Sequence, residues 1–240
     1  LGLIAFQTKN YLKSVEIIDR AIQVKPNDAD IYNFHAIVLI HLKKFEEAIK
    51  SWNCAIKIKP DYAEAYYNRG NAFFELKKIE SAITSYDKAI QIKPDYAEAY
   101  NNHGNALREL KKIESAIVSY DKAIQIKPDY AEAYYNRGIA LFDLNKIESA
   151  IASYDKAIQI KPDYADAYKN RGYALLDLNR IDASLESFDK AIKIKPDSDY
   201  LFGQLFHTKN SVCNWNFFKE DLEKLKNKTL KVQKISPPFP

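Results

Sequence analysis

The sequence predicts an all-α solenoid built from antiparallel helix pairs, with a capping helix at its C-terminal end. Two observations carry this prediction. Prolines recur at a fixed interval of 34 residues, and the sequence between them is nearly repeated. Small residues also return at fixed positions of every unit, where paired helices have to approach closely. The recurring prolines are Pro26, Pro60, Pro94, Pro128, Pro162 and Pro196.

Residues 61–94 show how one unit is read as two helices. We expect Asp61 to be the N-cap of a first helix over 63–76, with Glu64 as its capping-box partner. Two lysines at 77–78 mark the turn, and the second helix spans 79–93. Proline cannot continue a helix because its ring clashes with the preceding turn, so Pro94 ends the unit.

The repeat divides the chain into three parts. Residues 29–198 hold five full units, and residues 1–28 form a partial unit that starts within a first helix. We therefore expect the sequence to be a piece of a longer protein. The partial unit has lost its neighbour, so its apolar edge predicts a homodimer through that edge. Residues 199–240 depart from the repeat and predict a capping or junction helix with a proline-rich end.

Small residues explain how the two helices of a unit pack. Counting each unit from Ala29, Ala63, Ala97, Ala131 or Ala165, position 8 is small and position 27 is always alanine. Glycine within a helix costs about 1 kcal/mol relative to alanine, so its recurrence needs a reason. We expect close contact between the paired helices at this position. The glycines at position 8 are Gly70, Gly104, Gly138 and Gly172.

These units resemble the tetratricopeptide repeat (TPR) family. The repeat length, the small residue at position 8, alanine at positions 20 and 27, an aromatic at 24 and proline at 32 all match its pattern. The sequence departs from it at position 7, which holds Arg69, His103, Arg137 and Arg171, and at Ser184, which replaces alanine. The resemblance implies a right-handed superhelix whose first helices line a concave groove that holds extended peptides.

Helical geometry identifies a second face on the first helices. At about 100° per residue, positions 2, 6, 9 and 13 lie opposite the packing positions 4, 8 and 11, which predicts an exposed stripe. An amide carries both a donor and an acceptor, so asparagines on this stripe are candidate peptide-binding residues. The acidic residues at positions 2 and 13 favour basic segments. A solvated face repeated by duplication remains the alternative. The candidates are Asn68, Asn102, Asn136 and Asn170 at position 6, with Asn71 and Asn105 at position 9.

The sequence offers no sign of catalysis by this chain. It contains no HExxH, GxSxG or glycine-rich phosphate loop, so we expect no catalytic, cofactor-binding or metal-ligating residues. Cys54 and Cys213 belong to no cysteine cluster, which indicates a reducing compartment and predicts the cytoplasm. The near balance of 36 basic and 32 acidic residues argues against nucleic acid, and no apolar run is long enough for a membrane span.

The end of the chain resembles a second family. Cys213, Asn214, Trp215 and Phe218 are similar to a C-D-W-x-x-[FY] helix in O-linked N-acetylglucosamine transferases, including SPINDLY-like bacterial members, with asparagine in place of the aspartate. Pro237, Pro238, Phe239 and Pro240 then match a proline-bearing segment that leads into the catalytic region. The resemblance implies that this chain recruits the protein substrate of such an enzyme. The alternative is a free-standing TPR adaptor with no enzymatic parent.

Overall fold

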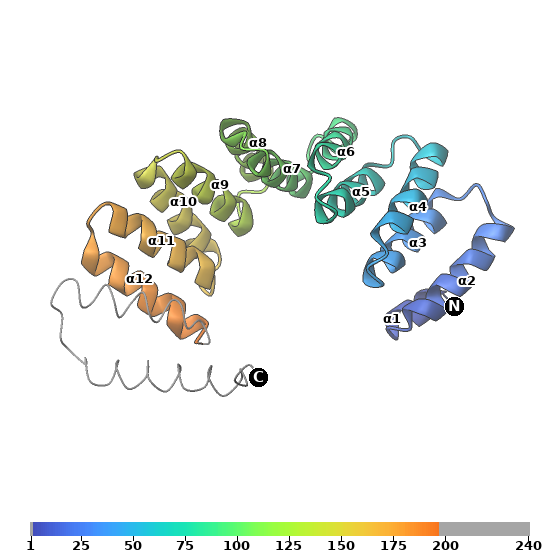
Figure 1. The fold of residues 1–240 in the computed structure, drawn as a ribbon, viewed down its shortest axis with the longest axis horizontal. Coiled ribbons are helices and arrows are strands. Elements are labelled where there is room, and N and C mark those ends of the chain that lie inside the picture. The colour runs from blue at the N-terminus through green and yellow to red at the C-terminus, as the bar shows by residue number, and fades with distance from the viewer. Residues whose placement is uncertain (1, 197–240) are drawn as a thin grey trace, which may run out of the picture. The chain divides into compact units, whose positions relative to one another are not determined.

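The computed structural model describes residues 2–196, and all regular structure in that range is helical (Figure 1). The chain forms two compact units, the first ending at Pro128 and the second beginning at Asp129. Unit 1 contains α1 (Gly2–Gln7), α2 (Tyr11–Val24), α3 (Ala29–His41), α4 (Phe45–Ile58), α5 (Ala63–Glu75), α6 (Ile79–Ile92), α7 (Ala97–Glu109) and α8 (Ile113–Ile126). The described part of unit 2 contains α9 (Ala131–Asp143), α10 (Ile147–Ile160), α11 (Ala165–Asp177) and α12 (Ile181–Ile194).

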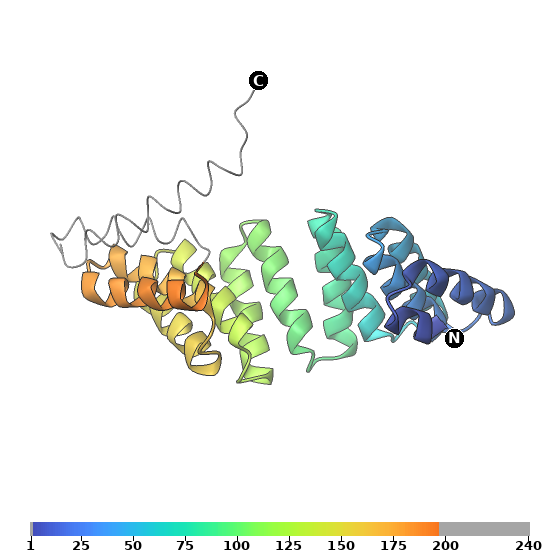
Figure 2. The same cartoon turned by 90° about the horizontal axis from the view of Figure 1, so that it is seen from below.

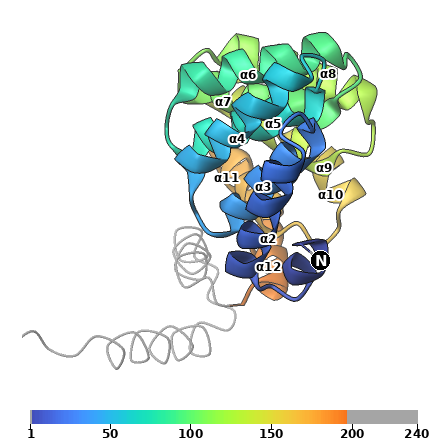
Figure 3. The same cartoon turned by 90° about the vertical axis from the view of Figure 1, so that its right-hand side faces the viewer.

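Each unit is a stack of antiparallel helix pairs. In unit 1, α3, α5 and α7 lie in one layer and α4, α6 and α8 in a second, and the partners of each pair lie side by side (Figures 1 and 2). Within unit 1, α2, α4 and α6 also pack against the first helix of the next pair, which is α3, α5 and α7 respectively. Unit 2 repeats this order, with α10 packed against both α9 and α11 (Figure 3). The sequence therefore correctly predicts an all-α fold of helix pairs.

The predicted cap at Asp61 is wrong. Helix α5 begins at Ala63 with Tyr62 at the N-cap position, and no side chain caps it. Among the helices of residues 2–196, only α3 has the expected acidic cap, because Asp28 directly precedes the helix and accepts from the backbone N–H groups of Asp30 and Ile31. In the later repeats a tyrosine occupies the position directly before the helix, and the aspartate lies one residue earlier. Tyr62 instead accepts a hydrogen bond from Asn33 Nδ2 at 3.0 Å and so fastens α5 to α3.

The turns between paired helices adopt one left-handed residue each. Lys77 has φ 58°, and its N–H donates to Phe74 O while the N–H of Lys78 donates to Phe73 O. This arrangement satisfies carbonyls that the end of α5 would leave unpaired. Lys9, Lys43, Lys111, Asn145 and Asn179 adopt the same conformation in the other turns.

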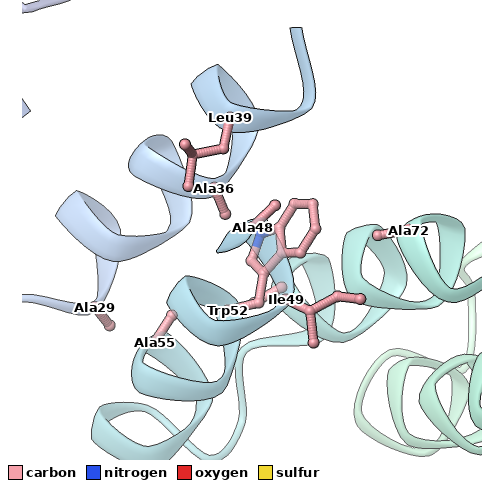
Figure 4. Close-up of a cluster of buried hydrophobic side chains, with 9 residues drawn as sticks. Ala29, Ala36, Leu39, Ala48, Ile49, Trp52, Ala55 and Ala72 are labelled. Atoms are coloured by element: carbon pink, nitrogen blue, oxygen red, sulfur yellow. The ribbon is translucent and has the colours of Figure 1, made fainter. Parts of the chain in front are cut away.

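An aromatic ring of the second helix lies against each position-8 glycine. A Cβ on Gly104 would lie 2.6 Å from Tyr120 Cε1, too close for any real pair of carbon atoms. The rings Tyr86, Tyr154 and Phe188 lie in the same way against Gly70, Gly138 and Gly172. In the first full repeat Ala36 replaces the glycine and Trp52 replaces the tyrosine. Figure 4 shows the Trp52 ring packed among Ala36, Leu39, Ala48 and Ala72.

The predicted prolines lie just beyond the second helices. Pro60 follows the C-cap Lys59 of α4, and Pro94, Pro128 and Pro162 follow the C-caps of α6, α8 and α10. Ser184, which departs from the family pattern, is fully buried and donates to Gly172 O at 2.8 Å. No helix within residues 2–196 has the length and apolar character to cross a membrane. The predicted capping helix and the Cys213–Phe218 resemblance fall outside the described residues.

Candidate functional site

Three cavities of similar construction lie along the layer of first helices. The first cavity, of about 190 Å³, is enclosed by α3, α4 and α5; the second, of about 370 Å³, by α5, α6 and α7. The third cavity, of about 340 Å³, lies in unit 2 among α9, α10 and α11. Each is lined by positions 9, 12 and 24 of one repeat and by positions 6 and 9 of the next. A cavity therefore recurs where one repeat meets the next.

Asn102, a predicted binding residue at position 6, is largely occupied within the protein. Its Nδ2 donates to Tyr67 Oη at 3.1 Å and to Asn71 Oδ1 at 2.9 Å, and its Oδ1 accepts from Asn101 Nδ2. Both amide hydrogens are thus committed to contacts inside unit 1. The side chain joins α7 to α5, which is a structural contribution to the stack.

Asn71, at position 9, has a different hydrogen-bond balance. Its Oδ1 accepts from Tyr86 Oη at 2.8 Å and from Asn102 Nδ2 at 2.9 Å, which fixes the orientation of the amide. Its two N–H groups make no hydrogen bond with the described residues, and Asn71 lines both the first and the second cavity. Asn105 is held similarly, since its Oδ1 accepts from Tyr120 Oη at 2.8 Å, and it also lines the second cavity. The asparagines at position 9 therefore carry amide N–H donors in a fixed orientation.

The remaining predicted asparagines differ in their surroundings. Asn136 is buried, at 8% exposure, whereas Asn68 and Asn170 are half-buried. Asn170 donates to Tyr135 Oη at 3.2 Å and lines the third cavity, and Asn68 lines the first. The prediction of one uniformly exposed stripe is therefore wrong. Asn102 and Asn170 at position 6 contact the first helix of the preceding repeat, so part of the stripe is covered by that repeat.

The second cavity is polar and carries a negative charge. Glu75 is exposed on its rim, forms no ion pair with the described residues, and also borders the first cavity. No lysine or arginine lines either cavity. Burial raises the pKa of Tyr86, and the nearby Tyr67 and Glu75 raise it further. The Tyr86 hydroxyl consequently stays protonated and continues to donate to Asn71.

The histidines lie away from these cavities at structural junctions. His103 Nδ1 lies 3.0 Å from Ser119 Oγ and its Nε2 lies 3.2 Å from Asp87 Oδ1. Arg171 takes the same place in another repeat, contacting Ser187 and Asp155, so the arrangement is a helix-bridging contact rather than a catalytic triad. Within residues 2–196 no three His, Cys, Asp or Glu side chains are grouped to hold a metal ion. Cys54 is free and exposed.

Family models match most of the repeating part of the chain. A model described as TPR repeat matches residues 38–77, 70–107, 104–145 and 138–179, and one described as tetratricopeptide repeat matches 165–198. The chain belongs to the tetratricopeptide repeat family. No curated protein sequence matches this TPR chain. The matches give no support to the resemblance between residues 211–240 and O-linked N-acetylglucosamine transferases.

Several solved TPR proteins share this fold. YrrB, described as a TPR protein with an unusual peptide-binding site, is 24% identical, with a TM-score of 0.66 over 82% of this chain and 99% of its own. MamA is 27% identical, with a TM-score of 0.63 over 66% of this chain and 92% of its own. PilF of Pseudomonas aeruginosa is 18% identical, with a TM-score of 0.73 over 88% and 93%.

Sequence reasoning missed most of the residues that shape the cavities. Position 12, which is Phe74 in the second cavity, figures in no prediction, and position 24, which is Tyr86 there, is predicted only as the aromatic of the repeat pattern. The signal that could have found the site is the variation at position 9. This position changes from Ile37 to asparagine and then to Ile139 and Tyr173, while its surroundings stay nearly constant.

Proposed function

We propose that this TPR chain is a protein-interaction scaffold that binds an extended segment of a partner protein along its first helices. One observation carries the proposal: cavities recur between successive repeats, and the second is lined by Asn71 and Asn105, whose amide oxygens are held by tyrosine hydroxyls and whose N–H groups bond no described residue. Peptide carbonyls are spaced regularly along an extended chain, so recurrent donors suit them whatever the partner's side chains. The peptide-binding site described for YrrB, a protein of the same fold, supports a similar use here.

The test begins with a phage-displayed library of random twelve-residue peptides selected on the whole chain. Selected peptides are synthesised, and their affinities for the wild type and for a double variant, Asn71→Ala with Asn105→Ala, are measured by fluorescence anisotropy. Each lost hydrogen bond contributes about 0.5–1.5 kcal/mol, so the loss of two predicts a Kd weaker by about five- to 150-fold. Thr84→Ala, an exposed change on α6, is the matched control. No selected peptide, or equal affinity for the double variant, would overturn the proposal.

A second candidate function rests on residues 211–240. Their similarity to the TPR-to-catalytic junction of SPINDLY-like O-linked N-acetylglucosamine transferases favours a role as the substrate-recruiting arm of such an enzyme. The free-standing adaptor is the alternative. The coding sequence that follows Pro240 tests the choice: a glycosyltransferase region there supports the enzyme arm, and a stop codon contradicts it.

We further propose cytoplasmic residence and self-association. The free, exposed thiol of Cys54 suits a reducing compartment. Leu3 and Ile4 of α1 are more than half exposed, at 56% and 59%, which favours a homodimer through this edge. Light scattering coupled to size exclusion measures the mass, and replacing Leu3 and Ile4 with serine should reduce a dimer to a monomer.

A further inference from the structure

We propose that the first and second cavities of unit 1 together read a two-part motif, an apolar side chain followed or preceded by a lysine or arginine. This inference rests on the proposed function, because it names the kind of partner segment that the same surface accepts. The two cavities adjoin, since Asn71 and Glu75 line both. A single extended segment can therefore place one side chain in each.

The first cavity has the lining that an apolar side chain requires. Ile37, Ile40, Phe45 and the face of Trp52 form most of its wall, and Ala72 of α5 leaves room opposite the indole (Figure 4). Its volume of about 190 Å³ exceeds the ~150 Å³ of an engineered apolar cavity that binds benzene. Burying an aliphatic or aromatic side chain there contributes about 1.5–3 kcal/mol of transfer free energy. The occupant is consequently a residue such as leucine or phenylalanine.

The second cavity has the lining that a cationic side chain requires. At position 9 the first cavity has Ile37 and Asn71, whereas the second has Asn71 and Asn105, so an asparagine stands in the second where the first has an isoleucine. The Glu75 carboxylate on the rim has no cationic partner among the described residues. The Phe74 ring at position 12 also lines this cavity, and Lys77 Nζ lies 5.7 Å from the ring centre, so the attraction for the partner's cation is assigned to Glu75 alone. Charge complementarity therefore selects lysine or arginine over a neutral or acidic residue.

The third cavity indicates that position 9 determines the choice. It lies in unit 2 and keeps the phenylalanine at position 12, the tyrosine at 24 and the asparagine at 6, as Phe142, Tyr154 and Asn170. At position 9 it has Ile139 and Tyr173 in place of the two asparagines. The same repeat framework thus holds an apolar or a polar cavity according to one position.

The spacing of the motif follows from helix packing. The axes of neighbouring packed helices are about 8–10 Å apart, and we take this as the separation of the two cavities. An extended chain advances about 3.3 Å per residue. The apolar and the basic side chains are therefore expected to be about three residues apart in the partner.

The experiment uses the random-peptide selection on the whole chain and compares enriched sequences with the input library. We expect lysine or arginine about three residues from a leucine, isoleucine, phenylalanine or methionine. The leading peptide is then made in two forms, with its basic residue kept or replaced by norleucine. Glu75→Gln should weaken the basic form about two- to fivefold and leave the norleucine form unchanged. Glu114→Gln, an equal change of charge on the exposed face of α8, should alter neither.

The position-9 argument is tested with Ile37→Asn, which gives the first cavity the residue that the second has. This variant should lose affinity for peptides with the apolar residue by about tenfold and keep its affinity for peptides lacking it. Enriched peptides without a basic residue, or equal affinities of wild type and Glu75→Gln, overturn the motif while the scaffold stands. Failure to enrich any peptide overturns the scaffold and the motif together.

Discussion

At the residue scale, one position per repeat ties three helices together. In four repeats, position 7 of the first helix reaches a buried serine on its own second helix and a polar side chain on the preceding second helix. Arg69 does this by donating to Ser85 Oγ at 3.2 Å and to Asn53 Oδ1 at 2.8 Å. His35 does so through Ser51 and Asp19. Arginine and histidine are thus geometrically interchangeable here, but only histidine changes its charge near neutral pH.

The histidine repeats give the fold a pH dependence. Burial lowers the pKa of His103 below its usual 6.5, although Asp87 opposes the shift, and burial lowers that of His35 against Asp19 and Glu47. The unfolded chain therefore takes up protons at a higher pH than the folded chain does. The stability associated with the neutral rings is present above pH 6.5 and is lost as the pH falls through 6.5 and then the folded-state pKa.

We expect the free energy of unfolding to fall between pH 7.5 and 5.5, and to fall less in His103→Arg. Urea denaturation at the two pH values, followed by circular dichroism, measures both slopes. The variant supplies the arginine that Arg69 and Arg171 use at the same position, so it retains the bridge. Identical slopes for the two proteins would show that His103 does not contribute.

At the scale of the elements, the sequence predicts helix existence better than helix ends or cavities. Paired helices follow from the periodic small and large residues, since the space left by Gly104 is filled only when the Tyr120 ring of the partner helix packs against it. The cap prediction at Asp61 failed by one residue: α5 begins at Ala63, as α3 begins at the equivalent Ala29, so Tyr62 and not Asp61 occupies the N-cap position. The covering of Asn102 depends on α5 of the neighbouring repeat. The residue pattern of a single helix predicts its faces, but it does not predict which side chains of neighbouring helices cover them.

The close contact of paired helices predicts the effect of Gly104→Ala. A methyl group there would overlap the Tyr120 ring, which is fully buried, so the ring or the helix has to shift. We expect a loss of about 1–3 kcal/mol in the free energy of unfolding, measured with urea. Combining it with Tyr120→Leu should lose less than the two single losses added, because the overlap disappears. Strict additivity would argue against the contact as the cause.

The left-handed turn residues predict a stabilising change. Lys111 has φ 60° between α7 and α8, a conformation that costs an ordinary L-residue about 1–2 kcal/mol. Glycine adopts it without strain, so Lys111→Gly should raise the free energy of unfolding by about 1 kcal/mol. Thermal unfolding detects the gain, and Lys112→Gly, one residue further on, is the control that should not stabilise. A lower midpoint for Lys111→Gly would contradict the strain argument.

At the scale of the whole molecule, each stack is held by contacts between neighbours. In the described part of unit 1, α7 packs against α6 and α8 and touches α5, while α1 packs against α2. Stability in such an arrangement is approximately a sum of repeat terms and nearest-neighbour interface terms. A local change is then felt mainly by the pairs that share an interface with it. In a protein with a single central core, the same substitution would change the stability of every helix.

Hydrogen exchange followed by mass spectrometry distinguishes these two possibilities with Gly104→Ala. The weakened contact lies between α7 and α8, so their amides should exchange faster, those of α5 and α6 less so, and those of α1 and α2 hardly at all. In the wild type α1 should exchange fastest within unit 1, because it is six residues long and has a single buried residue, Ala5. Equal acceleration across unit 1 would mean that it opens as one cooperative body. In that case the cavities along α3, α5 and α7 would open together with the whole of unit 1. With nearest-neighbour coupling, a substitution in one repeat changes mainly the cavity that this repeat lines.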